Sequence, residues 1–204
     1  MNMLFVDHGI FRLIYLNKHQ VTPEFYRLAQ PTPWDIRALV RSGCQTLVTL
    51  RGGREYGSWS LEKEACAAEG LVLEEVTVRS RAAPDREMLL KSKDFFASLA
   101  YPVAVHCKAG ADRAGFMSAL YLLVHKNRSV AEAKEQLSLL YGHFRFSKTG
   151  ILDDFFDGYE ECRQKTGIDF FTWVRDVYNP EALEKAHRTR FITHIFVDYI
   201  LHRE

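Results

Sequence analysis

The stretch Val103-Ala104-Val105-His106-Cys107-Lys108-Ala109-Gly110-Ala111-Asp112-Arg113-Ala114-Gly115 decides how this chain is interpreted. The apolar run 102–106 is typical of a buried β-strand, and the pattern from Arg113 to Val124 predicts a helix. Residues 107–113 therefore form a loop that leads from a strand into a helix. Gly110 permits a backbone turn that few other residues can adopt.

A loop of this kind is suited to hold a tetrahedral anion. Successive backbone N–H groups can point inward as a nest, and the helix N-terminus adds partial positive charge. The same field stabilises a thiolate, which makes Cys107 a candidate nucleophile. The planar fork of Arg113 can hold two phosphate oxygens. The alternative is a buried structural cysteine beside a core histidine, and we favour the catalytic interpretation.

His106–Arg113 matches the HCxxGxxR signature, and the chain resembles the cysteine-dependent protein tyrosine and dual-specificity phosphatases, especially bacterial ones. The similarity extends over about residues 22–165 and includes Tyr26-Arg27, Gln30-Pro31, Thr46–Leu50 and Tyr141-Gly142-His143. Residues after 165 resemble the C-terminal extension of the bacterial group. We expect a catalytic domain at 1–166 and a helical extension at 167–204 packed on it.

The resemblance implies a two-step reaction. Cys107 attacks phosphorus and forms a phosphocysteine, while a carboxylic acid protonates the leaving oxygen and its conjugate base then activates water. No metal and no cofactor are implied, and His106 is expected to order the loop. The phosphate oxygens are expected to bind to Lys108, Ala109, Gly110, Ala111, Asp112 and Arg113.

Two positions depart from the family pattern. Ala114 stands where the family usually has Ser or Thr, whose hydroxyl eases breakdown of the phosphocysteine, so slow hydrolysis of the intermediate is expected. The usual Trp-Pro-Asp acid loop is absent, and Asp85 and Asp112 are the candidate acids, with a slight preference for Asp112. Asp85 could instead offset a helix dipole, and Asp112 could brace the loop by accepting from arginines.

The remaining pattern indicates an α/β fold with a central, mostly parallel sheet of four or five strands flanked by helices. Strands are predicted at Ile10–Leu16, Glu24–Ala29, Thr46–Leu50, Leu71–Val78 and Pro102–His106. The first two are expected to pair across the region 18–22. Helices are predicted to begin at Pro33 behind a Thr32 cap, after Ser60, at Pro84, after Ser129 with Leu137, Leu139 and Leu140 on it, after Thr149 and at Pro180.

The charge balance and the cysteine content bear on the partner of this protein and on its cellular compartment. The 204 residues contain 27 Lys and Arg against 26 Asp and Glu, a balance that argues against a dedicated nucleic-acid binder. Four cysteines without a CxxC pair indicate free thiols in a reducing compartment. The sequence contains no convincing signal peptide and no stretch of membrane-spanning length, so a cytoplasmic location is expected.

The sequence favours a phosphorylated protein as substrate and leaves other possibilities open. Lys108 is the loop's single lysine, whereas phosphoinositide phosphatases that resemble it carry another at the position of Ala111. Arg79, Arg81 and Arg86 could nevertheless bind an anionic phospholipid or phosphoinositide head group. A slow or inactive phosphate-binding module is a second alternative, and thiol-redox or arsenate chemistry through Cys44 or Cys66 is a third. Other candidate neighbours of the site are Arg51, Arg54, Tyr56, Trp59 and Phe144.

The C-terminal segment combines an apolar stripe with basic residues. Leu183, Phe191, Ile195 and Tyr199 recur largely at helical spacing, and the basic section lies at 185–190. We expect this helix to pack on the catalytic domain. A surface for peripheral membrane contact or for a partner subunit is the alternative.

Overall fold

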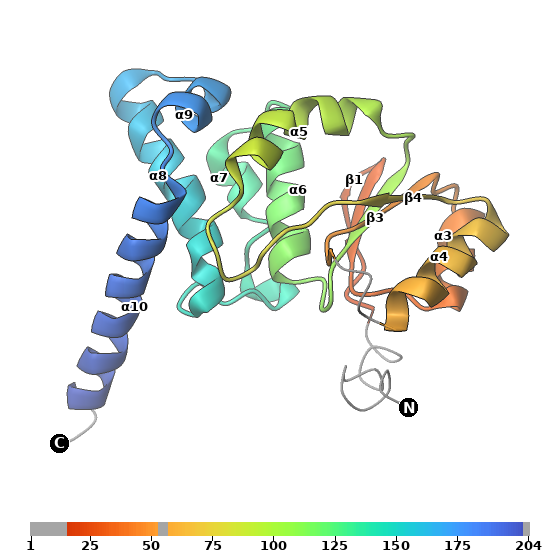
Figure 1. The fold of residues 1–204 in the computed structure, drawn as a ribbon, viewed down its shortest axis with the longest axis horizontal. Coiled ribbons are helices and arrows are strands. Elements are labelled where there is room, and N and C mark those ends of the chain that lie inside the picture. The colour runs from red at the N-terminus through yellow and green to blue at the C-terminus, as the bar shows by residue number, and fades with distance from the viewer. Residues whose placement is uncertain (1–15, 53–56, 202–204) are drawn as a thin grey trace.

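The computed structural model describes residues 16–52 and 57–201, and a single five-stranded sheet organises them (Figure 1). The strand order is β1-β2-β5-β3-β4, in which β1 pairs antiparallel with β2 and the other neighbours are parallel. The predicted fold class is therefore confirmed. The strands are β1 (His19–Thr22), β2 (Phe25–Leu28), β3 (Thr46–Thr49), β4 (Val72–Glu75) and β5 (Val103–His106).

Helices cover both faces of this sheet (Figure 1). Leu47 and Ala104 point toward the layer of α3 and α4, whereas Val48 and Val105 point toward a larger core that contains α5, α6 and α8. This alternation follows from the two-residue period of a strand. The helices are α3 (Pro33–Arg41), α4 (Gly57–Glu69), α5 (Arg86–Ser98), α6 (Asp112–Val124), α7 (Val130–Lys134), α8 (Ile151–Thr166), α9 (Phe170–Asp176) and α10 (Pro180–Leu201), with 3₁₀ turns η1 (Leu139–Tyr141) and η2 (Lys148–Gly150).

Local capping signals placed several helices correctly. Thr32 and Asp35 form a capping box at the start of α3, and Ser129 and Glu132 form another at the start of α7. Asp85 caps α5, so that helix begins at Arg86 rather than at Pro84. Ser60 lies inside α4, which makes the predicted cap at this residue wrong.

The N-terminal hairpin differs from the prediction. β1 lies at 19–22, within the region expected to be a connection, because its backbone pairs with β2 although its side chains are largely polar. The predicted strand at 10–16 falls outside the described residues, apart from Leu16, which is not in a strand. β4 is shorter than predicted, and Leu137, Leu139 and Leu140 follow α7 rather than lie on it.

The first half of α10 packs on the body of the protein. Asp154 of α8 accepts from His187 Nδ1 at 2.7 Å and pairs with Arg190, and Glu184 accepts from the backbone of Ala83 at 3.1 Å. The side chains of the apolar stripe from Phe191 onward lie outside the described residues. Within 16–52 and 57–201, no helix combines the length and apolar character needed to cross a membrane. The division of the chain at residue 166 stays a prediction.

Candidate active site

The predicted loop lies between the carboxyl end of β5 and the first turn of α6. Cys107 directly follows the central strand β5 and is only 3% exposed, and Asp112 is the first residue of α6. Cys107 therefore sits at the floor of the loop, in front of the positive end of the α6 dipole. Residues 107–113 thus lie together, in the loop between β5 and the first turn of α6.

Groups outside the loop hold four consecutive carbonyl oxygens. The carbonyl oxygen of Lys108 accepts from the backbone N–H of Gln30 at 3.4 Å, and that of Ala109 accepts from Asn17 Nδ2 at 2.9 Å. Arg27 Nη2 donates to the carbonyl oxygens of Gly110 and Ala111, each at 2.8 Å. In a trans peptide the C=O and the next N–H point in opposite directions. The N–H groups of residues 109–112 therefore face the inner side of the loop, as an anion nest requires.

Arg27 is the main internal support of the loop. It is fully buried in β2, its guanidinium also donates to the side chain and backbone of Gln136, and it stacks 4.0 Å from the ring centroid of Tyr141. Burial lowers the pKa of Arg27 to about 10, so the group stays charged at neutral pH. Its role is to fix backbone carbonyls, and its charge adds to the positive field around Cys107.

Gly110 is required by both conformation and space. Its φ of +72° lies in the left-handed region, and a Cβ there would lie 2.7 Å from the backbone nitrogen of Ala29. The loop therefore packs directly against the end of β2. This close approach brings the loop within reach of Arg27.

His106 and Arg113 extend the support to neighbouring strands and helices. His106 is fully buried, and its Nε2 lies 2.6 Å from Glu62 Oε1 of α4. Arg113 Nη1 donates to the carbonyl oxygen of Leu50 at 3.4 Å, a long contact that leaves the guanidinium other donors for a ligand. The geometry is compatible with the loop-ordering role expected of His106.

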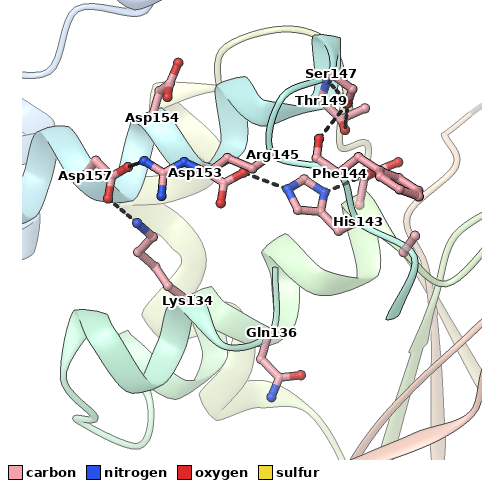
Figure 2. A network of polar contacts seen from close by, with 12 residues as sticks. Lys134, Gln136, His143, Phe144, Arg145, Ser147, Thr149, Asp153, Asp154 and Asp157 are labelled. Atoms are coloured by element: carbon pink, nitrogen blue, oxygen red, sulfur yellow. Dashed lines mark hydrogen bonds and ion pairs between the residues drawn. The ribbon is translucent and has the colours of Figure 1, made fainter. Parts of the chain in front are cut away.

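Asp112 belongs to a buried chain of carboxylates and imidazole. Its Oδ1 accepts from His143 Nδ1 at 2.7 Å, and Asp153 Oδ2 accepts from His143 Nε2 at 2.6 Å. Figure 2 shows the contact between His143 and Asp153 beside a second cluster in which Asp157 pairs with Lys134 and Arg145. Asp112 therefore accepts from His143, whereas the bracing alternative considered from the sequence had arginines as its donors.

Asp85 occupies a different environment. Its Oδ1 accepts from the backbone N–H of Met88 at 2.8 Å, as a helix cap does. It lines a separate cavity of about 440 Å³ together with Arg79, Pro84 and Glu184. Neither Cys107 nor any other residue of the loop lines that cavity.

The other residues that the sequence suggested as neighbours of the phosphate loop lie in different parts of the structure. Arg86 donates to the carbonyl oxygen of Tyr178, and Arg51 donates to Gln30 Oε1 at 2.9 Å, so both serve internal contacts. Trp59 Nε1 donates to Glu75 Oε1 at 3.0 Å. Arg54 and Tyr56 lie outside the described residues. Within the described parts of the chain, no cluster of histidine, cysteine or carboxylate side chains is arranged to hold a metal ion.

Phe144 lies beside the His143 cluster at a cavity of about 700 Å³. Leu139, Phe144 and Phe146 are largely exposed and form the apolar part of its lining, together with buried Leu137. The lysine and the arginine of the lining, Lys134 and Arg145, are both paired with Asp157. His143 lines this largely apolar cavity and also contacts Asp112, at the end of the loop that leads into α6.

Cys44 and Cys66, the candidate redox partners of Cys107, lie in a different part of the core from Cys107. Cys44 and Cys66 pack in the core between the sheet and the α3–α4 layer, whereas Cys107 belongs to the core on the other face. Burial raises the pKa of the Cys66 thiol to about 12 and also raises that of Cys44. The structure therefore places neither thiol as a resolving partner for Cys107.

Several supporting residues were not assigned a role from the sequence. The sequence places Arg27, His143 and Asp153 within stretches that resemble the family and Glu62 near a helix start, but it gives none of them, nor Asn17, a role at the loop. A charged residue inside the otherwise apolar end of β2 was the available signal for Arg27. The partners of His143 and Asn17 lie on distant segments, which no local pattern discloses.

A mostly parallel sheet whose central strand ends in a Cys107–Arg113 anion loop defines a cysteine-dependent phosphatase domain. Residues 15–151 match the family described as DSP-PTPase phosphatase fused to NAD+ Kinase. The chain therefore belongs to this family, within the protein tyrosine and dual-specificity phosphatases, and is a hydrolase of phosphate esters. No curated protein matches the sequence.

Solved structures share the fold at low sequence identity. TpbA of P. aeruginosa is 18% identical with a TM-score of 0.58, and the match covers 75% of this chain and 92% of TpbA. The core catalytic domain of the PP-IP phosphatase SIW14 from S. cerevisiae is 18% identical with a TM-score of 0.55, covering 75% and 94%. PTPMT1 is 24% identical with a TM-score of 0.53, covering 73% and 99%. Other structures of the same proteins hold different phosphorylated ligands, pTyr in TpbA and PI(5)P in PTPMT1.

Proposed function

We propose that this chain hydrolyses phosphate monoesters through a phosphocysteine on Cys107, as a tyrosine- or dual-specificity-type protein phosphatase. The observation that carries the proposal is the outward anchoring of the four carbonyl oxygens of residues 108–111. With those carbonyls held, the loop presents N–H groups to an anion without reorganising, which is the form of preorganisation that stabilises charge in a transition state. Arg113 supplies the charged fork.

The residues support a defined order of bond changes. The Cys107 thiolate attacks phosphorus, the S–P bond forms, the bond to the leaving oxygen breaks, and a carboxyl group gives that oxygen a proton. Water then attacks phosphorus, the S–P bond breaks, and the carboxylate takes the proton from water. We assign the carboxyl to Asp112, because it adjoins Arg113 on the loop, whereas Asp85 caps α5 and lines a cavity apart from the loop.

The apolar cavity beside His143 favours a protein substrate. A phosphorylated residue in the loop would place a neighbouring apolar side chain of a peptide near Leu139 and Phe144. An anionic lipid surface is attracted by unpaired basic side chains, but Lys134 and Arg145 at this cavity are both paired with Asp157. A TpbA structure in complex with pTyr provides a precedent for such a substrate in this fold. The free thiols at 44, 66, 107 and 162 suit a reducing compartment such as the cytoplasm.

A substrate panel with a matched blank tests this proposal. Purified protein is assayed with phosphotyrosine, phosphoserine and phosphothreonine peptides, a phosphoinositide, phosphatidylglycerol phosphate and NADP+, with Cys107→Ser as the blank. We expect release of phosphate from phosphopeptides that the blank lacks, and trapping of ³²P on Cys107 after acid quench. Faster turnover of a lipid would replace the protein assignment, and binding without turnover would reassign the chain as a phosphate-binding module.

The contribution of the cavity is tested separately. Phe144→Ala should raise KM for a phosphotyrosine peptide with apolar flanking residues and leave KM for p-nitrophenyl phosphate unchanged. Trp34→Ala removes an aromatic side chain of similar exposure from α3, on the other face of the sheet, and serves as the control. An equal change of KM for both substrates in Phe144→Ala would contradict a peptide-binding role of the cavity.

A further inference from the structure

The contact between Asp112 and His143 joins the phosphate loop to a segment that is otherwise remote from it. His143 lies in the connection between α7 and α8, 31 residues after Asp112. Asn17 Nδ2 donates both to the carbonyl oxygen of Ala109 in the loop and to that of Tyr141, at 2.9 and 3.0 Å. The connection is therefore tied to the loop at two points, and the placement of His143 against Asp112 is built into the fold.

His143 can serve both carboxylates in only one protonation state. A neutral imidazole donates from one nitrogen, whereas the imidazolium donates from both, and here each nitrogen faces a carboxylate oxygen. The side chain of His143 is fully buried, so water does not compete for these bonds. Burial by itself lowers the pKa of an imidazole, but the hydrogen bonds to Asp112 and Asp153 outweigh it and raise the pKa of His143 to about 9.

The two carboxylates are not equivalent. The side chain of Asp153, in the first turn of α8, is almost fully buried, whereas the side chain of Asp112 is 28% exposed. Asp112 uses Oδ1 for His143, so its second carboxylate oxygen, Oδ2, is not taken up by this contact. Lys134 of α7 and Arg145 of the connection both pair with Asp157 of α8, and buried Arg27 interacts electrostatically with Asp112. Asp153 therefore anchors the imidazolium from behind, and Asp112 is the member that a substrate can reach.

We infer that His143, anchored by Asp153, is a positioning residue that holds the Asp112 carboxyl group at the rim of the phosphate loop for proton transfer. The inference rests on the proposed function and names the residues that make Asp112 effective. Asp112 enters the first step as the carboxylic acid, with its proton on Oδ2 while Oδ1 accepts from His143, and it gives that proton to the leaving oxygen. In the second step the resulting carboxylate takes a proton from the attacking water, which restores the acid. His143 keeps both of its protons throughout and exchanges none with the substrate.

This arrangement replaces a feature that the sequence lacks. The usual acid loop of the family is absent, and Asp85 serves as a helix cap. A carboxyl group on the loop itself needs a partner that fixes its rotamer, because an aspartate side chain at a helix start is otherwise free to turn toward backbone N–H groups. The His143 imidazolium is that partner, because it makes one charge-assisted hydrogen bond to Asp112 and is itself held by a second one to Asp153.

The chain offers a matched pair of variants for the test. Asp153→Asn removes the negative charge that anchors His143, while Asp154→Asn removes the charge of the adjacent residue, whose partners are His187 and Arg190 of α10. His143→Asn is the second variant, because its amide retains one donor near the position of Nδ1. Each is assayed with two substrates that differ in their need for a proton: an aryl phosphate with a strongly acidic leaving group, and a phosphotyrosine or alkyl phosphate.

We expect kcat on the substrate with the basic leaving group to fall about ten-fold or more in Asp153→Asn and His143→Asn, in line with loss of acid–base assistance. The activated aryl phosphate should change less than three-fold, vanadate affinity should stay unchanged, and Asp154→Asn should match the wild type on both substrates. An equal fall on both substrates, or a parallel loss of vanadate affinity, would show a purely structural role and overturn the inference alone. A wild-type protein without Cys107-dependent turnover would overturn the proposed function, and this inference with it.

Discussion

Arg27 Nη2 lies 2.8 Å from the carbonyl oxygen of Gly110, although 83 positions separate the two residues. The contact connects β2 to the middle of the phosphate loop, which follows the neighbouring strand β5. A buried arginine is stable in such a place only when most of its donors are satisfied, and here backbone carbonyls accept from both Nη groups, while Nε has no partner among the described residues. The loop is thus shaped from behind by a side chain that does not face the substrate.

Replacing Arg27 by Met should therefore damage both the loop and the fold. The change leaves the carbonyl oxygens of Gly110, Ala111 and Gln136 without this donor. We expect a loss of about 3 kcal/mol in the free energy of unfolding and a fall of more than ten-fold in vanadate affinity. Urea unfolding and vanadate inhibition measure these two effects.

Arg37→Met is the control for that experiment. Arg37 forms an exposed ion pair with Glu69 on the surface, and such a pair contributes less than about 1 kcal/mol. Stability and vanadate affinity should both stay near those of the wild type. An Arg27→Met protein with wild-type vanadate affinity would show that the loop keeps its shape without the arginine.

Gly110→Ala should lower the free energy of unfolding by more than the positive φ of this residue explains. Gly110 and Gly167 share a φ of +72°, but a Cβ at 110 would meet backbone atoms at 2.7 and 2.8 Å, whereas nothing lies within 4 Å at 167. Gly167→Ala should cost about 1 kcal/mol from φ alone, and Gly110→Ala about 1–3 kcal/mol more because the loop must shift. Equal unfolding free energies for the two variants would contradict the close packing of the loop.

The phosphate loop and the helix caps could be predicted from the sequence, whereas the first strand could not. The loop was predictable because its signals are local: a buried strand, a glycine and a helix start lie within thirteen residues. The caps at Thr32 and Ser129 were predictable for the same reason. The strand β1 was missed because its side chains show no apolar alternation, and its pairing with β2 defines it instead.

The choice between the two candidate acids depended on contacts that no local pattern encodes. Asp85 was considered from the sequence as a carboxylate that offsets a helix dipole, and it lies at the start of α5, where it accepts from the amide three residues further on. Asp112 has its partner His143 in a connection between two helices, and Asp153 a further ten residues along the chain. Their meeting depends on how α6 and α8 pack, which is a property of the tertiary structure.

Ala114→Ser should restore a hydroxyl where the family usually has one. Ala114 is fully buried in the first turn of α6, close in sequence to the loop. If breakdown of the phosphocysteine limits turnover, the wild type should show one stoichiometric burst followed by slow release, and the variant should turn over several-fold faster with a smaller burst. Ala119→Ser buries a hydroxyl elsewhere on α6 and is the control. A linear wild-type trace limited by the first step would remove this explanation.

The stability of the protein should depend on pH through His143. Its pKa is raised in the folded state from 6.5 to about 9, so folding favours the protonated form. The resulting stabilisation, on the order of 2–4 kcal/mol, is fully present below pH 6.5, declines between pH 6.5 and 9, and is lost above pH 9. Urea unfolding of wild type and His143→Asn between pH 6 and 10 should give a difference that shrinks as pH rises. Asp153→Asn should follow the same trend because a neutral amide replaces one of the two negatively charged acceptors, whereas a difference that is constant with pH would contradict a buried imidazolium.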